Sequence, residues 1–247
     1  MKVDYTNISK TYDSYRSYPD ILVKKIIRCG KISSEKRILD LGCGTGNVSL
    51  QVLDLVKLDI IGLDISIPML EVARKKSLGV ICANADNHGL PFHDNSFDTV
   101  MGVYIIHHIK NLSFLFSECF RLLRKGTLLL LTSSHEQIER QHPVIKQFFP
   151  SFISVDKGRF PDIQQVDSQL SSAGFRDVRH EEIRGGKMPL DDEYLQKVKG
   201  KHVSTYHLLP QKEFENGVER LENYIKNMRQ PEYREWQGTL IYGHKKE

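Results

Sequence analysis

The pattern of hydrophobic and polar positions predicts short buried strands that alternate with amphipathic helices over residues 20–183. Continuous apolar runs bounded by glycine or polar residues indicate strands, whereas apolar residues three and four positions apart indicate helices. The expected strands are 37–41, 59–65, 80–85, 97–106, 127–132 and 178–183, and the expected helices are 47–56, 69–76, 111–124 and 163–173. Apolar strands that alternate with helices form a parallel sheet covered on both faces, so we expect an α/β fold. Gly126 is expected to end the helix at 111–124.

The chain after residue 183 has a different character. Residues 190–199 are a charged helix candidate, and a last strand is expected at 239–244. The most regular helical pattern steps by four and three residues through Phe214, Val218, Leu221, Ile225 and Met228. We therefore predict that residues 184–236 form an inserted helical cap and not a second independent domain.

Composition and charge narrow the class of protein. The chain has 247 residues, of which 40% are hydrophobic and 27% charged, values typical of one large globular domain. The net charge of +4 comes from interspersed charges and not from a stripe of Lys and Arg, which argues against a nucleic-acid partner. This composition excludes disordered and fibrous classes.

The sequence does not predict a membrane-spanning segment, a signal peptide or a metal site. No apolar run approaches the ~20 residues that cross a bilayer, and residues 1–10 have no apolar core of a signal peptide. The four cysteines include no Cys-x-x-Cys pair, which argues against a zinc site or a redox dithiol. These features predict a cytoplasmic protein without a metal.

A glycine-rich turn directly follows the first predicted strand. It contains Asp40, Gly42, Gly44 and Gly46 and ends at Asn47. Glycines at this spacing permit positive φ and let the backbone approach a ligand, and ligands bind at the carboxyl edge of a parallel sheet. Asn47 stands where a dinucleotide-binding turn has its third glycine, and no Gly-Lys-Ser/Thr follows for a phosphate loop. Taken alone, the turn is also consistent with a tight strand–helix connection that binds nothing.

Two carboxylates follow the next two predicted strands. Asp64 ends the second strand about twenty residues after the glycines, where a carboxylate can accept hydrogen bonds from both ribose hydroxyls. Asp86, next to Ala85, follows the third strand, where a carboxylate can accept a hydrogen bond from an exocyclic adenine amine. Either aspartate alone is also typical of a helix start or a turn. Three neighbouring strand ends with suitable groups together predict a nucleoside site.

These residues resemble the class I S-adenosylmethionine-dependent methyltransferases over roughly residues 8–183 and the final strand. The similar motifs are ILDLGCGTG at Ile38–Gly46, Asp64 in GLDIS, Asp86 in ANADNHGLPF, FDTV at Phe97–Val100 running into His107 and His108, and LLRKGTLLL at Leu122–Leu130. The branch that the chain resembles has quinone-biosynthesis-like cores and methylates small molecules. The resemblance implies a Rossmann-like, mostly parallel sheet of seven strands with helices on both faces. Its antiparallel seventh strand, here Gly238–Lys245, would lie between strands five and six.

The resemblance also implies a site for S-adenosyl-L-methionine, whose product is S-adenosyl-L-homocysteine. The implied cofactor residues group by the part of the cofactor that they would face. These groups are Asp40, Gly42, Gly44 and Gly46 for the methionine part, Asp64 for the ribose hydroxyls, Ile65, Met69, Ala85 and Asp86 for the adenine, and Gly102 and Val103 for the sulfonium side.

The N-terminal segment resembles the YDxxRxxYP lid of the same family. Tyr12 would close over the cofactor and Arg16 would meet its carboxylate, although a surface turn is equally consistent with the segment. We therefore expect three parts: a lid and first helix at 1–36, a methyltransferase core at 37–183 and 237–247, and the helical cap at 184–236.

Methyl transfer needs a positioned nucleophile, and it needs a general base only for some acceptors. Candidate bases are His107, His108, His135, His142, Tyr206 and His207. Among them His107 is best placed by topology, although a histidine at a strand end often only caps backbone groups. Four phenylalanines after the fifth strand form either an acceptor wall or a buried cluster: Phe148, Phe149, Phe152 and Phe160.

The leading functional hypothesis is methyl transfer to a small-molecule acceptor. An RNA or protein methyltransferase is the first alternative, but strand four ends in Gly102-Val-Tyr-Ile and not in the Asn/Asp-Pro-Pro-aromatic turn typical of base amine methylation. A non-catalytic cofactor-binding subunit is the second alternative, and the intact cofactor motifs argue against it. The sequence predicts neither a particular acceptor nor an oligomeric state.

Overall fold

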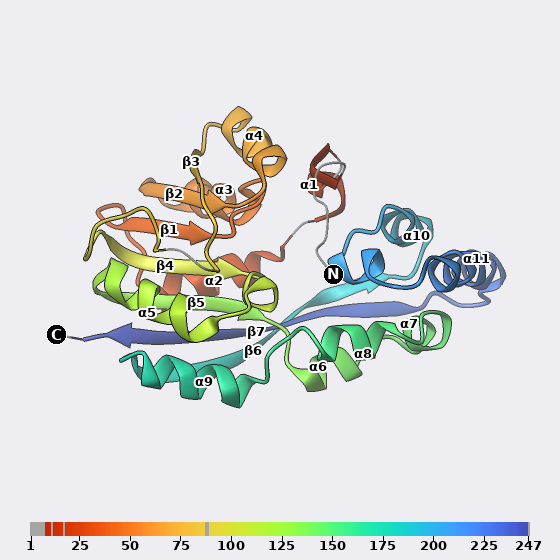
Figure 1. Cartoon of the computed structure of the whole chain (residues 1–247). Helices are drawn as coiled ribbons and strands as arrows, with labels where there is room; N and C mark the ends of the chain where they lie inside the picture. Colours follow the sequence, from red (N-terminus) through yellow and green to blue (C-terminus); the bar gives the residue numbers. More distant parts are fainter. Residues whose placement is uncertain (1–7, 11, 17, 87–88, 247) are drawn as a thin grey trace.

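One seven-stranded sheet organises the computed structural model, which describes residues 8–246 except 11, 17, 87 and 88 (Figure 1). The spatial order of the strands is β3-β2-β1-β4-β5-β7-β6. The strands are β1 Arg37–Leu41, β2 Asp59–Asp64, β3 Gly79–Cys82, β4 Phe97–Val103, β5 Leu123–Thr132, β6 Arg176–Pro189 and β7 Tyr233–Lys245. Strand β7 runs antiparallel to β5 and β6, and the other pairs are parallel. The predicted Rossmann-like fold, with an antiparallel last strand between strands five and six, is confirmed.

Alternating side chains of the central strands form the cores on the two faces of the sheet. In β5, Leu128 and Leu130 belong to one hydrophobic cluster, whereas Leu129 and Leu131 belong to the other, as the period of two in a strand requires. Helices α5 (Leu112–Leu122) and α9 (Ile163–Ser172) contribute to the first cluster. The second cluster includes apolar residues of α2 Asp20–Cys29, α3 Asn47–Leu55 and α4 Ile67–Lys75.

Strands β6 and β7 extend beyond the rest of the sheet and carry a second group of helices (Figure 1). Their pairing continues to Pro189 and Tyr233, well inside the region predicted as a helical insertion. The third hydrophobic cluster includes residues of α7 Pro143–Phe148, α8 Phe152–Lys157, α10 Asp192–Lys199, η3 Ser204–His207 and α11 Gln211–Asn227. The cap therefore packs with the segment after β5 into one unit, which we call the cap unit.

Two local predictions differ from the structure. Helix α5 ends at Leu122 and Gly126 lies inside β5, so the prediction that Gly126 ends the helix is wrong. A Cβ at Gly126 would lie 2.0 Å from the backbone oxygen of Asp98, which explains the glycine. Strand β4 ends at Val103, three residues earlier than predicted, because Tyr104 turns the chain with a φ of +53°.

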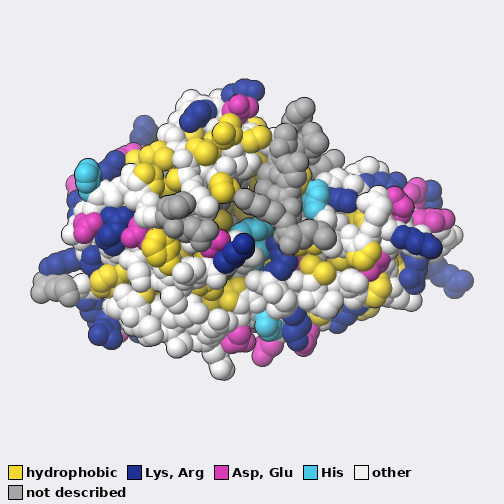
Figure 2. Space-filling view, viewed as in Figure 1, with side chains coloured by type: hydrophobic (Ala, Val, Ile, Leu, Met, Phe, Trp, Pro, Cys, Tyr) yellow, Lys and Arg dark blue, Asp and Glu magenta, His cyan; other side chains and the backbone are white. Residues whose placement is uncertain are grey.

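Two surface features bear on the partners of the chain. Lys and Arg side chains are interspersed with Asp and Glu on the face shown in Figure 2. Within the described part of the chain, no helix combines the length and apolar character that crossing a bilayer requires.

Candidate active site

The loop between β1 and α3 brings three glycines with positive φ to the carboxyl edge of the sheet. The φ angles are +71° at Gly42, +54° at Gly44 and +80° at Gly46. A Cβ at Gly42 would lie 2.6 Å from the side chain of Ile105, so any larger residue at this position would force Ile105 to shift. A Cβ at Gly44 would meet nothing within 4 Å. The loop is thus fixed from behind at Gly42 and open at Gly44, where a ligand can approach.

Asp64 ends β2 and holds the glycine loop. Its Oδ2 accepts a hydrogen bond from the backbone N–H of Gly44 at 2.9 Å, and its Oδ1 accepts one from Ser66 at 2.8 Å. Burial raises the pKa of Asp64, and these N–H donors oppose the rise. Each oxygen keeps a further lone pair, so the carboxylate can still accept hydrogen bonds from a ligand.

Asp40 lies behind the loop and is almost fully buried. Its Oδ2 accepts a hydrogen bond from the hydroxyl of Ser49 at 2.6 Å. Burial raises the pKa of Asp40 to about 7, against the opposing effect of the Ser49 hydroxyl. The carboxyl of Asp40 therefore changes charge near neutral pH, beside a cavity of about 30 Å³ that the loop and Val103 line.

Asp86 lies after β3 and faces the start of α5. Its Oδ1 accepts hydrogen bonds from the backbone N–H groups of Lys110 at 2.7 Å and Asn111 at 3.1 Å. Ala85 beside it is buried. Because β2 and β3 are parallel neighbours, Asp64 at the end of β2 and Asp86, four residues after the end of β3, follow adjacent strands.

The remaining residues predicted to contact a cofactor differ in exposure. Ile65, which directly follows Asp64, is 46% exposed. Met69, in contrast, is a buried residue of α4 and is 2% exposed. Gly102 is enclosed, since a Cβ there would lie 2.8 Å from Ile105. Of these three residues, Ile65 therefore offers the largest apolar surface at the edge of the sheet.

The strap, which we define as α1 (Tyr12–Tyr15) with Arg16 and Tyr18, crosses the glycine loop. Asp13 accepts a hydrogen bond from the Thr45 hydroxyl at 2.5 Å and forms an ion pair with Lys76 at 2.5 Å. Arg16 Nε donates to the backbone oxygen of His202 in the cap unit at 3.1 Å. The strap thus connects the glycine loop to the cap unit.

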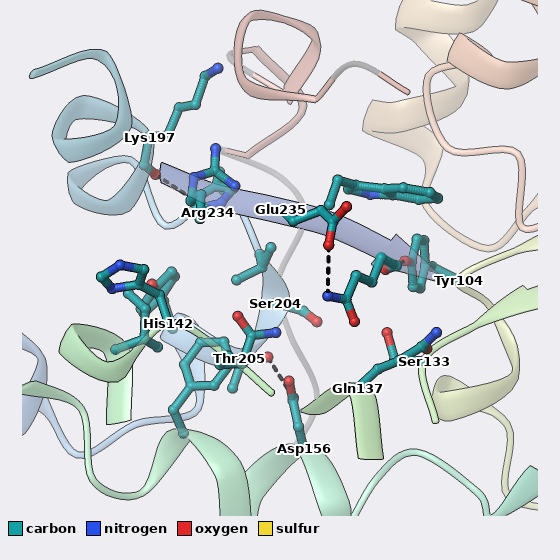
Figure 3. Close-up of a pocket in the computed structure, with 18 of the residues that line it drawn as sticks. Tyr104, Ser133, Gln137, His142, Asp156, Lys197, Ser204, Thr205, Arg234 and Glu235 are labelled. Atoms are coloured by element: carbon teal, nitrogen blue, oxygen red, sulfur yellow. Dashed lines mark hydrogen bonds between the residues drawn. The ribbon is translucent and has the colours of Figure 1, made fainter. Parts of the chain in front are cut away.

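A cavity of about 410 Å³ lies between the sheet edge and the cap unit (Figure 3). Tyr12 and Tyr18 of the strap line both this cavity and the smaller one beside the glycine loop. Other residues around it come from four regions: Tyr104, His107, His108 and Ser133 at the sheet edge, Gln137, Phe152, Asp156 and Phe160 after β5, Tyr194, His202, Thr205 and Tyr206 in the cap, and Arg234 and Trp236 on β7. The two cavities are thus neighbours separated by the strap, so a ligand at the glycine loop would lie close to the larger cavity.

His107 lines the larger cavity next to two other rings. Its ring stacks on Phe160 at a centroid distance of 4.2 Å and contacts His108 at 4.1 Å. Its Nδ1 is buried and has no hydrogen-bond partner among the described residues. Burial, with the charges of neighbouring groups, lowers the pKa of His107 well below its ordinary value. The ring is therefore neutral at pH 7 and keeps unused hydrogen-bonding capacity.

The other candidate bases divide into two groups. His108, His142 and Tyr206 line the larger cavity, and His142 pairs with Glu232 at 3.3 Å. His135 and His207 are not part of its lining, and their Nε2 atoms bond to the backbone oxygens of Phe160 and Lys201. Of the four phenylalanines singled out in the sequence, Phe152 and Phe160 line the cavity, while Phe148 and Phe149 pack inside the cap unit.

Several cavity residues had no signal in the sequence. Asp156 in α8 accepts a hydrogen bond from the Thr205 hydroxyl at 2.6 Å, and burial raises its pKa to about 6. Arg234 lies on the polar outer half of β7. Among the cavity residues that were not singled out from the sequence, Tyr104 lies near the end of the predicted fourth strand, so the expected sheet topology could have pointed to it.

A family model described as a methyltransferase domain matches residues 39–131. The chain is 26% identical over 159 residues to phosphoethanolamine N-methyltransferase 1 of Arabidopsis thaliana. This alignment covers 63% of this chain and 32% of the plant protein. It is 26% identical over 210 residues to a ubiquinone/menaquinone biosynthesis C-methyltransferase of Geotalea daltonii, covering 75% of this chain and 88% of that protein. The chain thus spans about a third of the plant relative and most of the bacterial one.

A solved structure has the same fold. It is Haemonchus contortus phosphoethanolamine N-methyltransferase 2 in complex with phosphomonomethylethanolamine and S-adenosylhomocysteine. The superposition has a TM-score of 0.64 at 18% identity and covers 100% of this chain and 61% of that one.

Proposed function

Because the chain contains a class I S-adenosylmethionine-dependent methyltransferase domain, we propose that it transfers a methyl group from S-adenosylmethionine to a small-molecule acceptor. The observation that carries this proposal is the 410 Å³ cavity, which shares Tyr12 and Tyr18 with the smaller cavity beside the glycine loop. Its volume lies in the ordinary range for small-molecule sites. The relatives act, by their names, on phosphoethanolamine and on quinone precursors, so they support a small acceptor without agreeing on one.

The residues at the sheet edge fit the cofactor of this family. Gly44 leaves open space beside the loop, and the Asp64 carboxylate keeps lone pairs for the ribose hydroxyls. Ile65 would lie against the adenine, whose amine would reach Asp86. When bound, S-adenosylmethionine supplies an electrophilic methyl group on a sulfonium, which a nucleophile displaces in line.

The strap and the cap unit would exclude water from the reacting atoms. The cavity beside the glycine loop has a volume of about 30 Å³ with the strap in place, so we expect the strap to shift when the cofactor binds. Its return re-forms the contacts of Asp13 with Thr45 and Lys76. A closed site strengthens electrostatic contacts to the reacting groups and prevents hydrolysis.

His107 is our candidate for the group that orients the nucleophile. Its unpartnered Nδ1 lies on the cavity wall next to the end of β4. Since the ring is neutral, Nδ1 can accept a hydrogen bond from an acceptor N–H or O–H as that proton is lost. Tyr104, whose hydroxyl donates to the backbone oxygen of Gln237 at 3.4 Å, lines the same cavity and would limit the space for the acceptor.

Two measurements test the proposed function. S-adenosylhomocysteine should raise the melting temperature of the protein by mass action, and the rise should grow with concentration. Formation of S-adenosylhomocysteine should then be measured with a panel of small amines, phenols and carboxylic acids, and with bulk RNA and protein. Absence of cofactor binding at millimolar concentration, or transfer only to RNA or protein, would overturn the proposal.

A further inference from the structure

We propose that the acceptor carries an anionic oxygen group, a carboxylate or a phosphate, which the guanidinium of Arg234 binds inside the 410 Å³ cavity. This inference rests on the proposed function, because it assigns a chemical class to the acceptor of the same site.

Arg234 is the unusual cation of the cavity. Its Nε is buried without a hydrogen-bond partner, and no carboxylate pairs with its guanidinium within the described part of the chain. The guanidinium lies 4.2 Å from the centroid of the Tyr194 ring, which fixes its position. Because a buried donor without a partner is unfavourable, a ligand that supplies an acceptor to this side chain would be favoured.

The other cations around the cavity have protein partners. Arg140 forms an ion pair with Glu182 at 3.2 Å, and Lys197 forms one with Glu193 at 2.6 Å. Arg16 donates to a backbone oxygen of the cap unit. Arg234 therefore presents a planar set of donors that a carboxylate or phosphate can match with two parallel hydrogen bonds.

The acidic residues around the cavity do not neutralise Arg234. Asp156 is held by Thr205 and lies 3.6 Å from a guanidinium nitrogen of Arg159. Glu235 accepts a hydrogen bond from the side-chain amide of Gln237 at 3.3 Å.

The charge of Arg234 also reaches the neighbouring histidines. Burial, together with the charges of Arg16 and Arg234, lowers the pKa of His202 to about 3. Burial likewise lowers the pKa of His142, where Glu232 opposes the effect and Arg234 adds to it. His202 and His142 are therefore neutral at pH 7, and they neither add to nor offset the charge of Arg234.

The position of Arg234 constrains the shape of the acceptor. In Figure 3, Arg234 and Lys197 lie on one side of the view, and Tyr104 and Ser133 lie on the other. Tyr104 follows β4 at the sheet edge, close to the proposed place of methyl transfer. The acceptor would therefore be a two-ended molecule, with its nucleophile near the end of β4 and its anionic group at Arg234.

The single tryptophan of the chain reports on this cavity. Trp236 lines the cavity two residues beyond Arg234 on the same strand, and the sequence contains no other tryptophan. We would saturate the full-length protein with S-adenosylhomocysteine and follow its fluorescence during titration with phenyl phosphate, benzoate and neutral benzamide. We expect saturable responses to at least one of the two anions and none to benzamide over the same range.

Variants assign the response to Arg234. Arg234→Gln should weaken the affinity for the anion at least tenfold. Arg234→Lys keeps the positive charge but loses the paired, planar N–H donors of the guanidinium, so it should weaken the affinity several-fold. Arg229→Gln removes an equal charge from an exposed position outside the cavity lining and should leave it unchanged. The anion that binds with the higher affinity, phenyl phosphate or benzoate, identifies the acceptor as a phosphate or a carboxylate.

The results can also contradict the inference. An unchanged anion titration in both folded Arg234 variants, a benzamide response equal to that of benzoate, or no response to either anion would overturn it. The proposed function fails separately, if S-adenosylhomocysteine itself does not bind.

Discussion

The backbone N–H of Gly44 donates a 2.9 Å hydrogen bond to Oδ2 of Asp64, and this contact links the glycine loop to the end of the neighbouring strand. One carboxylate therefore has two tasks: it fixes the conformation of the loop, and it offers lone pairs at the edge of the sheet. Loss of Asp64 should affect a ligand both directly and through the loop.

Substitution of Asp64 tests this relationship. We expect Asp64→Ala to weaken binding of S-adenosylhomocysteine by about 1–3 kcal/mol, because the ligand loses charge-assisted hydrogen bonds. Calorimetric titration measures the change. Asp54→Ala removes an exposed carboxylate from α3 and should leave the affinity unchanged. An unaltered affinity in Asp64→Ala would show that the ribose lies elsewhere.

The sequence predicted the parts of the site that depend on local patterns. The glycine loop and Asp64 were predictable because positive φ angles need glycine and because parallel strands end at one edge. The outer halves of β6 and β7 were not predictable, since their side chains alternate weakly in burial and their pairing depends on residues about 45 positions apart. Arg234 could not be assigned to the cavity for the same reason: its neighbour Tyr194 is brought to it only by that pairing.

The ion pair between Asp13 and Lys76 should slow the release of the cofactor. Lys76 also donates to the backbone oxygen of Thr45 and to Asn47, both at 3.0 Å, so Lys76→Met removes one ion pair of the strap and two hydrogen bonds of the glycine loop. The pair is partly exposed, so we expect a loss near 1 kcal/mol and roughly fivefold faster dissociation of S-adenosylhomocysteine. Stopped-flow dilution measures this rate. Lys75→Met, at an exposed neighbouring position, is the control, and equal rates in both variants would contradict a role for the strap.

His107 should influence turnover more than binding. His107→Gln keeps a polar side chain but removes the neutral imidazole whose Nδ1 has no partner in the described structure. Once an acceptor is known, we expect kcat to fall about 10²-fold, with little change in the affinity for S-adenosylmethionine. His93→Gln, at an exposed position, should behave as wild type. A wild-type kcat in His107→Gln would make His107 a packing residue.

Gly217 in α11 should resist even a small substitution. Replacing a helical glycine by alanine ordinarily stabilises a helix by about 1 kcal/mol. Here the new Cβ would lie 2.3 Å from the ring of Phe149 and 2.7 Å from the backbone oxygen of Phe148. Overpacking costs about 1–3 kcal/mol, so we expect Gly217→Ala to lower the free energy of unfolding of the protein. Urea denaturation measures it, and Asn216→Ala, exposed on the same helix, should not be destabilising.

The carboxyl of Asp40 should make the stability of the protein decrease as the pH rises. Burial raises its pKa to about 7, whereas a carboxyl in the unfolded chain ionises near pH 3.8. Between these values the folded state holds a proton that the unfolded state has lost, so the contribution of Asp40 is fully present below about pH 4 and is lost as the pH rises through 7.

Asp40→Asn removes this ionisation and keeps an oxygen that can accept the hydrogen bond from Ser49. We expect the pH dependence of the free energy of unfolding to change by up to about 1.4 kcal/mol per pH unit between pH 4 and 7. The variant should therefore gain stability relative to the wild-type protein as the pH increases. Urea denaturation at pH 5, 6, 7 and 8 measures both proteins, with Asp54→Asn as an exposed control on α3. Parallel pH profiles for Asp40→Asn and the wild-type protein would show that Asp40 ionises as readily in the folded state as in the unfolded chain.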